Sequence, residues 1–158
     1  MRLSESKIKE AILHADAAIR ERVVRYFDRC FSQDTTVVPL VIQAVERYGR
    51  EGAYQLVGGC TDLAHTDDTI SWVIEELNRE DADQYENYAY NLMRVLYHAD
   101  PRLLVHRDTQ IIEARHFDAA LRDNFLERLA LLSWDEAACW RSWRRFARLA
   151  KTKTNSGM

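Results

Sequence analysis

The five histidines are the residues whose type and spacing first suggest chemistry. Each stands two positions before an aspartate, and the pairs are His14/Asp16, His65/Asp67, His98/Asp100, His106/Asp108 and His116/Asp118. Imidazole nitrogens and carboxylate oxygens bind zinc and iron, so a set of such pairs would suit a zinc or di-iron centre. Di-iron sites in helix bundles draw on two Glu-x-x-His motifs, however, and the sequence lacks that pair of motifs.

Helix ends explain the His-x-Asp pattern better than a metal does. A histidine in the last turn of a helix interacts favourably with the partial negative charge there. An aspartate two residues later can cap the first amides of the next helix. The pattern therefore predicts five helix junctions, and we expect no metal site and no cofactor.

The segment from Gly52 to Thr61 superficially resembles a phosphate-binding loop because it is rich in glycine. It lacks the Gly-Lys-Ser/Thr ending and follows a helical pattern, which argues against nucleotide binding. Cys60 and His65 would form a nucleophile–base pair only if this loop folded back on itself, so a turn cysteine is the simpler interpretation. No Gly-x-Ser-x-Gly or His-Glu-x-x-His motif is present, and we predict a protein that is not an enzyme.

Apolar residues recur at helical spacing along almost the whole chain, which predicts an all-α fold. In the segment near residue 70, for example, Ile70, Val73, Ile74 and Leu77 form one stripe. The glycines other than Gly157 lie between Gly49 and Gly59, where we expect a break or hinge. The expected helices span residues 4–14, 17–32, 35–49, 68–79, 83–98, 102–114, 117–132 and 133–151.

The last of these helices is basic and amphipathic. It opens with a capping-box pattern at Ser133 and Glu136. Cys139, Trp140, Trp143 and Phe146 project to one side. The opposite side carries a row of basic residues, which are Arg141, Arg144, Arg145, Arg148 and Lys151.

This basic row is the candidate partner-binding surface. Between Arg141 and Lys153 there are six bases and no acid, whereas Asp62 to Glu86 holds nine acids and one base, Arg79. The row could face solvent on a terminal capping helix, or meet an acidic partner, a phosphate backbone or a membrane surface. It could also pair with the acidic middle of the same chain.

The composition indicates one ordered domain. The chain has 158 residues, of which 47% are hydrophobic and 30% charged, with only two prolines. The net charge of -3 argues against a surface devoted entirely to nucleic acid. Three widely spaced cysteines indicate a reducing, cytoplasmic compartment, and neither a standard signal peptide nor a membrane-spanning segment is expected.

Three junctions look like copies of one turn, which are those at His14/Asp16, His65/Asp67 and His98/Asp100. The first continues into the run Asp16-Ala17-Ala18-Ile19-Arg20. This run resembles the turn between the helices of HEAT-type repeats, in which an aspartate precedes an apolar–Arg pair. The resemblance is clearest over residues 1–48, since Ser71 and Leu104 stand at the arginine position in the other two turns.

The resemblance implies a short right-handed α-solenoid of stacked helical hairpins, with about eight or nine helices. We expect one HEAT-like domain over residues 1–151, with the glycine-rich break at 49–59, and a flexible tail at 152–158. The predicted function is a non-catalytic protein-interaction module with a protein partner, whose identity and oligomeric state stay open.

The alternative is a nucleic-acid-binding relative of the HEAT-like DNA glycosylases that uses the basic helix. Such an enzyme would bring an aspartate and aromatic residues together in a basic groove. Asp135, Trp140 and Trp143 are near the basic row, but their positions favour roles in the cap and the core.

Overall fold

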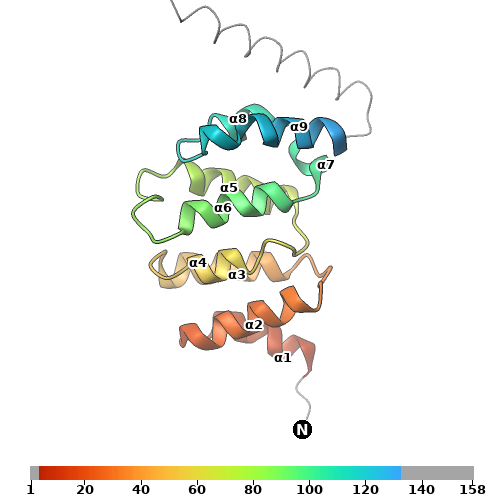
Figure 1. Ribbon diagram of the computed structural model, residues 1–158. Helices are drawn as coiled ribbons and strands as arrows, with labels where there is room; N and C mark the ends of the chain where they lie inside the picture. Colours follow the sequence, from red (N-terminus) through yellow and green to blue (C-terminus); the bar gives the residue numbers. More distant parts are fainter. Residues whose placement is uncertain (1–3, 133–158) are drawn as a thin grey trace, which may run out of the picture. The chain divides into compact units, whose positions relative to one another are not determined.

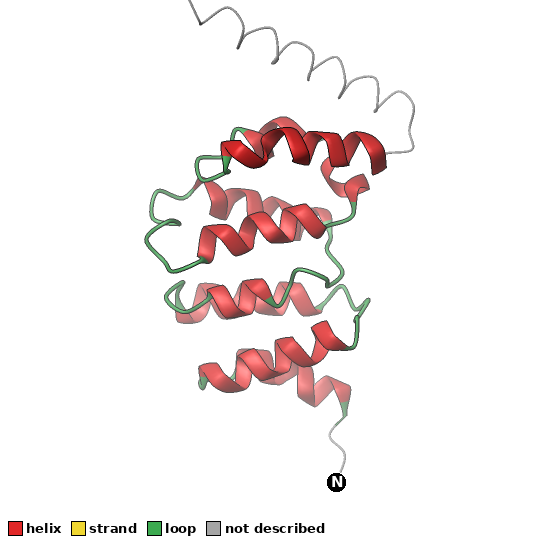
Figure 2. Cartoon of the chain, in the orientation of Figure 1, coloured by secondary structure: helices red, strands yellow, loops and turns green. Residues whose placement is uncertain are grey.

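The structure, a computed structural model, describes residues 4–132, and within that range it contains helices and no strand (Figure 2). Contacts between residues divide it into two units. The first comprises the chain up to Ala99 together with Ala114–His116, and the second comprises Asp100–Glu113 together with the residues from Phe117 onward.

The first unit is built from six α-helices and a 3-10 turn. These are α1 (Glu5–Glu10), η1 (Ala11–Leu13), α2 (Ala17–Arg29), α3 (Val37–Tyr48), α4 (Tyr54–Gly58), α5 (Asp67–Asn78) and α6 (Tyr88–His98). In Figure 1 they follow one another in layers, first α1 with α2, then α3 with α4, then α5 with α6. Helix α4 packs against both α2 and α6, while α3 packs against η1 and α5. Thus α2, α4 and α6 form one row of helices, and η1, α3 and α5 form the other.

The second unit contains α7 (Pro101–Leu104), α8 (Asp108–Ile112), the 3-10 turn η2 (Ala119–Leu121) and α9 (Arg122–Leu132). Helix α7 packs against α9. The rings of Phe117 and Phe125 meet edge to face, with their centroids 5.6 Å apart. Leu104 and Ile111 are fully buried, so this unit also has apolar side chains removed from water.

The all-α prediction is confirmed for the described residues, which contain nine α-helices. The stripe predicted near residue 70 is also correct, since Ile70, Val73, Ile74 and Leu77 are all buried in α5. Within the described part of the chain, no helix is long and apolar enough to cross a membrane. The prediction of a single domain and of a tail at 152–158 stays a prediction.

Several expected helix boundaries were wrong, among them that of the helix expected over 117–132, since α9 begins at Arg122. Helix α6 begins at Tyr88 rather than at residue 83, because Arg79 and Tyr85 both donate to the carboxylate of Asp81 and these local bonds compete with a helix. The helix expected over 102–114 is two short helices, separated by a turn in which the Arg107 amide donates to the Leu104 carbonyl at 2.8 Å. The glycine-rich segment 49–59 contains a helix, α4.

The aspartates of the five pairs lie at helix starts, as predicted. The predicted place of the histidines, in the last turn of a helix, is correct for His98 but wrong for His65, His106 and His116, which lie in turns or loops. Asp16, Asp100 and Asp118 cap α2, α7 and η2, each accepting a bond from the amide two residues ahead at 2.8–2.9 Å. Asp67 and Asp108 instead occupy the first helical position. In α5 the cap is Thr66, whose hydroxyl accepts from the Thr69 amide while the Thr69 hydroxyl accepts from the Thr66 amide.

Candidate functional site

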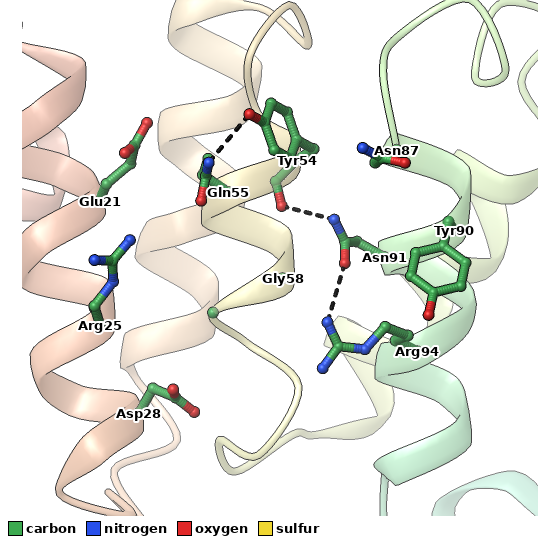
Figure 3. Close-up of a pocket in the computed structure, with 11 residues that line it drawn as sticks. Glu21, Arg25, Asp28, Tyr54, Gln55, Gly58, Asn87, Tyr90, Asn91 and Arg94 are labelled. Atoms are coloured by element: carbon green, nitrogen blue, oxygen red, sulfur yellow. Dashed lines mark hydrogen bonds between the residues drawn. The ribbon is translucent and has the colours of Figure 1, made fainter.

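A groove of about 440 Å³ in the first unit is the candidate site (Figure 3). Its volume lies within the range of roughly 300–1,000 Å³ that ligand pockets occupy. Helices α2, α4 and α6 all contribute to it. The lining residues are Glu21, Arg25, Asp28, Tyr54, Gln55, Gly58, Gly59, Asn87, Tyr90, Asn91 and Arg94.

Two glycines allow α4 to lie close to its neighbours on both sides. A Cβ on Gly58 would lie 3.2 Å from Oδ1 of Asn91 in α6. A Cβ on Gly59 would lie only 2.7 Å from Cγ1 of Val24 in α2, a distance that real Cβ atoms essentially never show. At Gly58 and Gly59 the wall of the groove is therefore formed by backbone atoms and not by side chains.

Asn91 joins α6 to α4 at this wall. Its side chain is 7% exposed, and its amide nitrogen donates to the Tyr54 carbonyl at 3.1 Å. Its amide oxygen accepts from the guanidinium of Arg94 at 3.4 Å (Figure 3). Asn91 thus contacts both α4 and Arg94 at the groove.

Several polar groups in the groove are not used to hold the fold. Asn87 has a left-handed backbone, with φ of 53°, and its side chain makes no capping bond to α6. Tyr90 is 57% exposed. Arg25 forms no ion pair with any residue in the described part of the chain (Figure 3). Because the protein itself does not satisfy these donors and acceptors, they are available to a ligand.

The charges in the groove balance, with Glu21 and Asp28 against Arg25 and Arg94. Burial raises the pKa of the Asp28 carboxyl, and the nearby carboxylate of Asp62 raises it further. Arg29 and Arg94 act in the opposite direction, but the pKa stays above its ordinary value. Asp28 is therefore a carboxylate whose charge the protein compensates incompletely.

Cys60 and His65 do not form a nucleophile–base pair. The Cys60 thiol donates to the Leu56 carbonyl at 3.3 Å, and the imidazole Nε2 of His65 contacts the carbonyl of Cys60 at 2.8 Å rather than its sulfur. Burial raises the pKa of the Cys60 thiol to about 12, the opposite of what activates a cysteine. Cys60 is a turn cysteine, as the sequence predicted.

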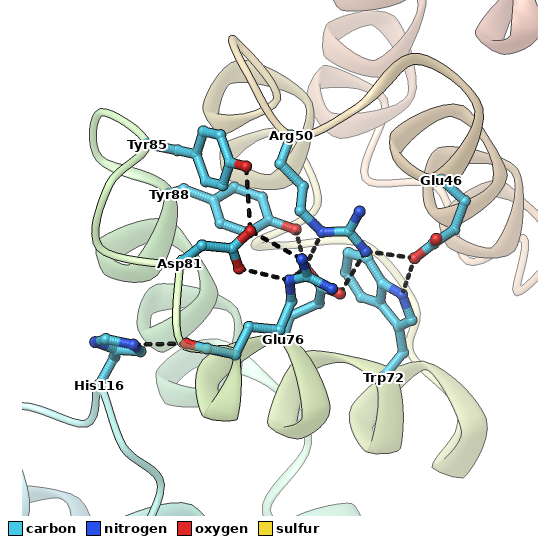
Figure 4. A network of polar contacts seen from close by, with 9 residues as sticks. Glu46, Arg50, Trp72, Glu76, Asp81, Tyr85, Tyr88 and His116 are labelled. Atoms are coloured by element: carbon cyan, nitrogen blue, oxygen red, sulfur yellow. Dashed lines mark hydrogen bonds and ion pairs between the residues drawn. The ribbon is translucent and has the colours of Figure 1, made fainter.

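A second polar cluster lies between α3, α5 and α6 (Figure 4). Glu76 is 4% exposed, and its carboxylate accepts two bonds from Arg50, each 2.7 Å long. The hydroxyl of Tyr88 donates to the same carboxylate at 2.7 Å. Burial and this carboxylate together raise the pKa of Tyr88, so the phenol stays protonated.

The outer part of this cluster is also paired. Glu46 accepts from Arg50 at 2.8 Å and from the Trp72 indole at 3.2 Å. Arg79 binds Asp81, and the Arg79 carbonyl contacts the imidazole of His116 at 2.7 Å (Figure 4). Because its members are bonded to one another, the cluster is interpreted as a structural connection rather than a binding site.

The basic row predicted from the sequence, Arg141, Arg144, Arg145, Arg148 and Lys151, lies outside the described residues, as does the capping box at Ser133 and Glu136. The described part of the chain contains no group of three or more histidine, cysteine, aspartate or glutamate residues able to hold a metal ion.

Sequence reasoning missed the groove, because its residues come from three helices that are far apart in the chain. One signal was available. The segment 83–98 carries apolar residues on two faces, and Tyr90, which lies on the second face, points to the groove rather than to the core.

Comparisons with known proteins found no match. No protein-family model matches the chain, and neither a curated protein nor a solved structure matches it.

Replacing Gly59 with alanine tests the close packing of α4 on α2. We expect Gly59→Ala to lower the free energy of unfolding by about 1–3 kcal/mol through overpacking against Val24, measured by urea denaturation. In a protein that already carries Val24→Ala, the added methyl group no longer meets the Val24 side chain. Gly59→Ala should therefore lower the free energy of unfolding by less there than in the unmodified chain. Strictly additive effects of the two substitutions would contradict this contact.

Replacing Glu76 with glutamine tests the buried cluster. Removal of the charge leaves Arg50 without its buried partner, and we expect a loss of about 3 kcal/mol in the free energy of unfolding. Glu46→Gln removes a carboxylate whose side chain is 52% exposed, and it should cost under about 1 kcal/mol. Equal losses of unfolding free energy in the two variants would show that the burial of Glu76 does not determine the size of the loss.

Proposed function

We propose that this chain is a non-catalytic, HEAT-like protein-interaction module that binds a segment of a partner protein in the groove of α2, α4 and α6. The observation that carries the proposal is the set of polar groove side chains, Asn87, Tyr90 and Arg25, that the fold does not use. The proposal places the module in the cytoplasm, as the odd number and wide spacing of its cysteines predict.

The first turn supports the HEAT-like part of the proposal. Asp16 caps α2, and Arg20 reaches back to donate to the carbonyls of His14 and Ala15 at 2.7 and 2.8 Å. The Arg20 guanidinium also lies 4.1 Å from the centre of the Tyr48 ring in α3. The Asp and Arg of the resemblance therefore both stabilise the junction between successive helices. The layering of α1 to α6 agrees with stacked hairpins.

The chemistry of the groove favours a peptide over a small apolar ligand. The side-chain amides of Asn87 and Gln55 can each donate and accept, which matches the alternating N–H and C=O groups of an extended backbone. Tyr54 and Tyr90 offer aromatic surface with a polar tip, the combination enriched in protein interfaces. Both features suit an extended chain lying between α2 and α6.

A randomised synthetic peptide library tests this function. We expect the purified protein to retain a subset of peptides, and the double variant Asn87→Gly/Tyr90→Ala to bind that subset at least about tenfold more weakly. Glycine at position 87 keeps the left-handed backbone, so the variant should fold normally.

The matched control is Gln43→Ala/Arg47→Ala, which removes two exposed side chains from α3. This variant should bind the same peptides as tightly as the unmodified chain. Retained peptides that bind the Asn87→Gly/Tyr90→Ala variant with full affinity, or a library from which nothing is retained, would overturn the proposed function.

Nucleic-acid binding through the C-terminal basic row is the alternative function. Its support is the sequence alone, which places six bases and no acid between Arg141 and Lys153. A phosphate-binding surface loses affinity steeply as salt rises, with a logarithmic slope of about -0.9 for each phosphate neutralised on duplex DNA. A neutral peptide groove has no such dependence.

Fluorescence anisotropy with mixed-sequence duplex DNA and RNA, at low and at moderate salt, separates the two functions. With a peptide-binding groove as the functional site, we expect no salt-sensitive binding, and the variant Arg144→Glu/Arg145→Glu should behave like the unmodified chain. Salt-sensitive binding that this variant abolishes would favour the nucleic-acid function instead.

A further inference from the structure

Resting on the proposed function, we propose that the groove selects an extended peptide with an acidic side chain between two basic ones, at alternate positions. The central carboxylate binds Arg25 and Arg94. The two flanking basic side chains face Glu21 and Asp28. The ligand class is therefore an internal peptide segment with a basic–x–acidic–x–basic pattern.

Arg25 and Arg94 differ in their partners from Arg50 and Arg79 of the same unit. Arg50 and Arg79 bind carboxylates of their own chain, at distances of 2.7 and 2.9 Å. Arg25 forms no hydrogen bond with the other residues drawn in Figure 3, and Arg94 forms a long one, of 3.4 Å, to the amide oxygen of Asn91. A guanidinium that lines a groove and lacks a carboxylate partner is suited to a carboxylate of a ligand.

The position of α4 leaves room for that carboxylate. Helix α4 packs between α2, which carries Arg25, and α6, which carries Arg94. Gly58 lies on this part of α4 and carries no side chain into the groove (Figure 3). A ligand side chain can therefore enter the groove beside α4, which both arginines line.

The charges along α2 define the flanking positions. Glu21 and Asp28 precede and follow Arg25 by four and three residues, which are rises of about 6 and 4.5 Å along a helix. Side chains on one face of an extended peptide recur about every 6.6 Å. A basic–x–acidic–x–basic segment thus places opposite charges near all three α2 side chains.

Asp28 favours a basic neighbour from the ligand. Its carboxyl is partly buried near Asp62, and its pKa is raised first by this burial and then by the negative charge of Asp62. A lysine or arginine of the ligand would supply positive charge near the carboxylates of both Asp28 and Asp62. A peptide with several acidic residues would instead meet Glu21 and Asp28 with like charges.

Glu21 and Asp28, which precede and follow Arg25 on α2, both line the groove. A peptide that ended at the arginines with its terminal carboxylate would leave one of these two acids without a ligand group. This is the reason to assign the central carboxylate to an internal aspartate or glutamate side chain.

Dye-labelled peptides with blocked ends test the specificity by fluorescence anisotropy. We expect a Lys-x-Glu-x-Lys peptide to bind about tenfold or more tightly than the same peptide with glutamine at the centre, because a charged hydrogen bond is lost. The variant Arg25→Glu/Arg94→Glu should reverse this preference and favour a Glu-x-Lys-x-Glu peptide. The matched control Arg47→Glu, on α3, should keep the original preference.

The outcomes separate this inference from the proposed function. If library peptides depend on Asn87 and Tyr90 but the central acid has no effect, the specificity is wrong and the groove function stands. If an unblocked peptide binds through its C-terminal carboxylate more tightly than the blocked peptide, the assignment to an internal side chain is wrong. If no peptide depends on the groove, the proposed function fails and the specificity with it.

Discussion

The close contact of α4 with its two neighbours is the constraint on which the candidate site depends. Helix α4 has five residues, and its C-terminal end lies close to Val24 of α2 and Asn91 of α6. A Cβ at position 59 would lie only 2.7 Å from Val24, and one at position 58 would lie 3.2 Å from Asn91. Larger side chains there would separate the helices or fill the groove. The same two glycines therefore allow the row of α2, α4 and α6 to form and leave its surface open between α2 and α6.

Charged groups have two distinct roles in the first unit. Arg50 and Glu76 are bonded to each other and to Tyr88 at the junction of α3, α5 and α6, where an unpaired charge would be costly. Arg25 and Arg94 line a groove that is open to solvent, where an arginine can stay without a carboxylate partner at little cost. The contrast between satisfied and unsatisfied arginines is what distinguishes a structural cluster from a candidate binding surface.

Much of the local structure was predictable from the sequence because it depends on neighbouring residues. The buried stripe of α5 follows from 3.6-residue periodicity, and Asp16, Asp100 and Asp118 cap helices because their carboxylates reach amides two residues ahead. Boundaries failed where side chains form competing local bonds. Asp81 accepts from Arg79 and Tyr85, and the segment that looked helical became the turn before α6.

By itself the sequence determined the helical class, the caps at three junctions and the turn in which Asp16 and Arg20 support the first pair of helices. Only the tertiary structure decided that Gly58 and Gly59 are packing residues and that Arg25, Asn87 and Arg94 share one groove. Periodicity shows which face of a helix is apolar, but it carries no information on which other helix approaches that face. Residues 25 and 94 line the same groove because α4 packs against both of their helices.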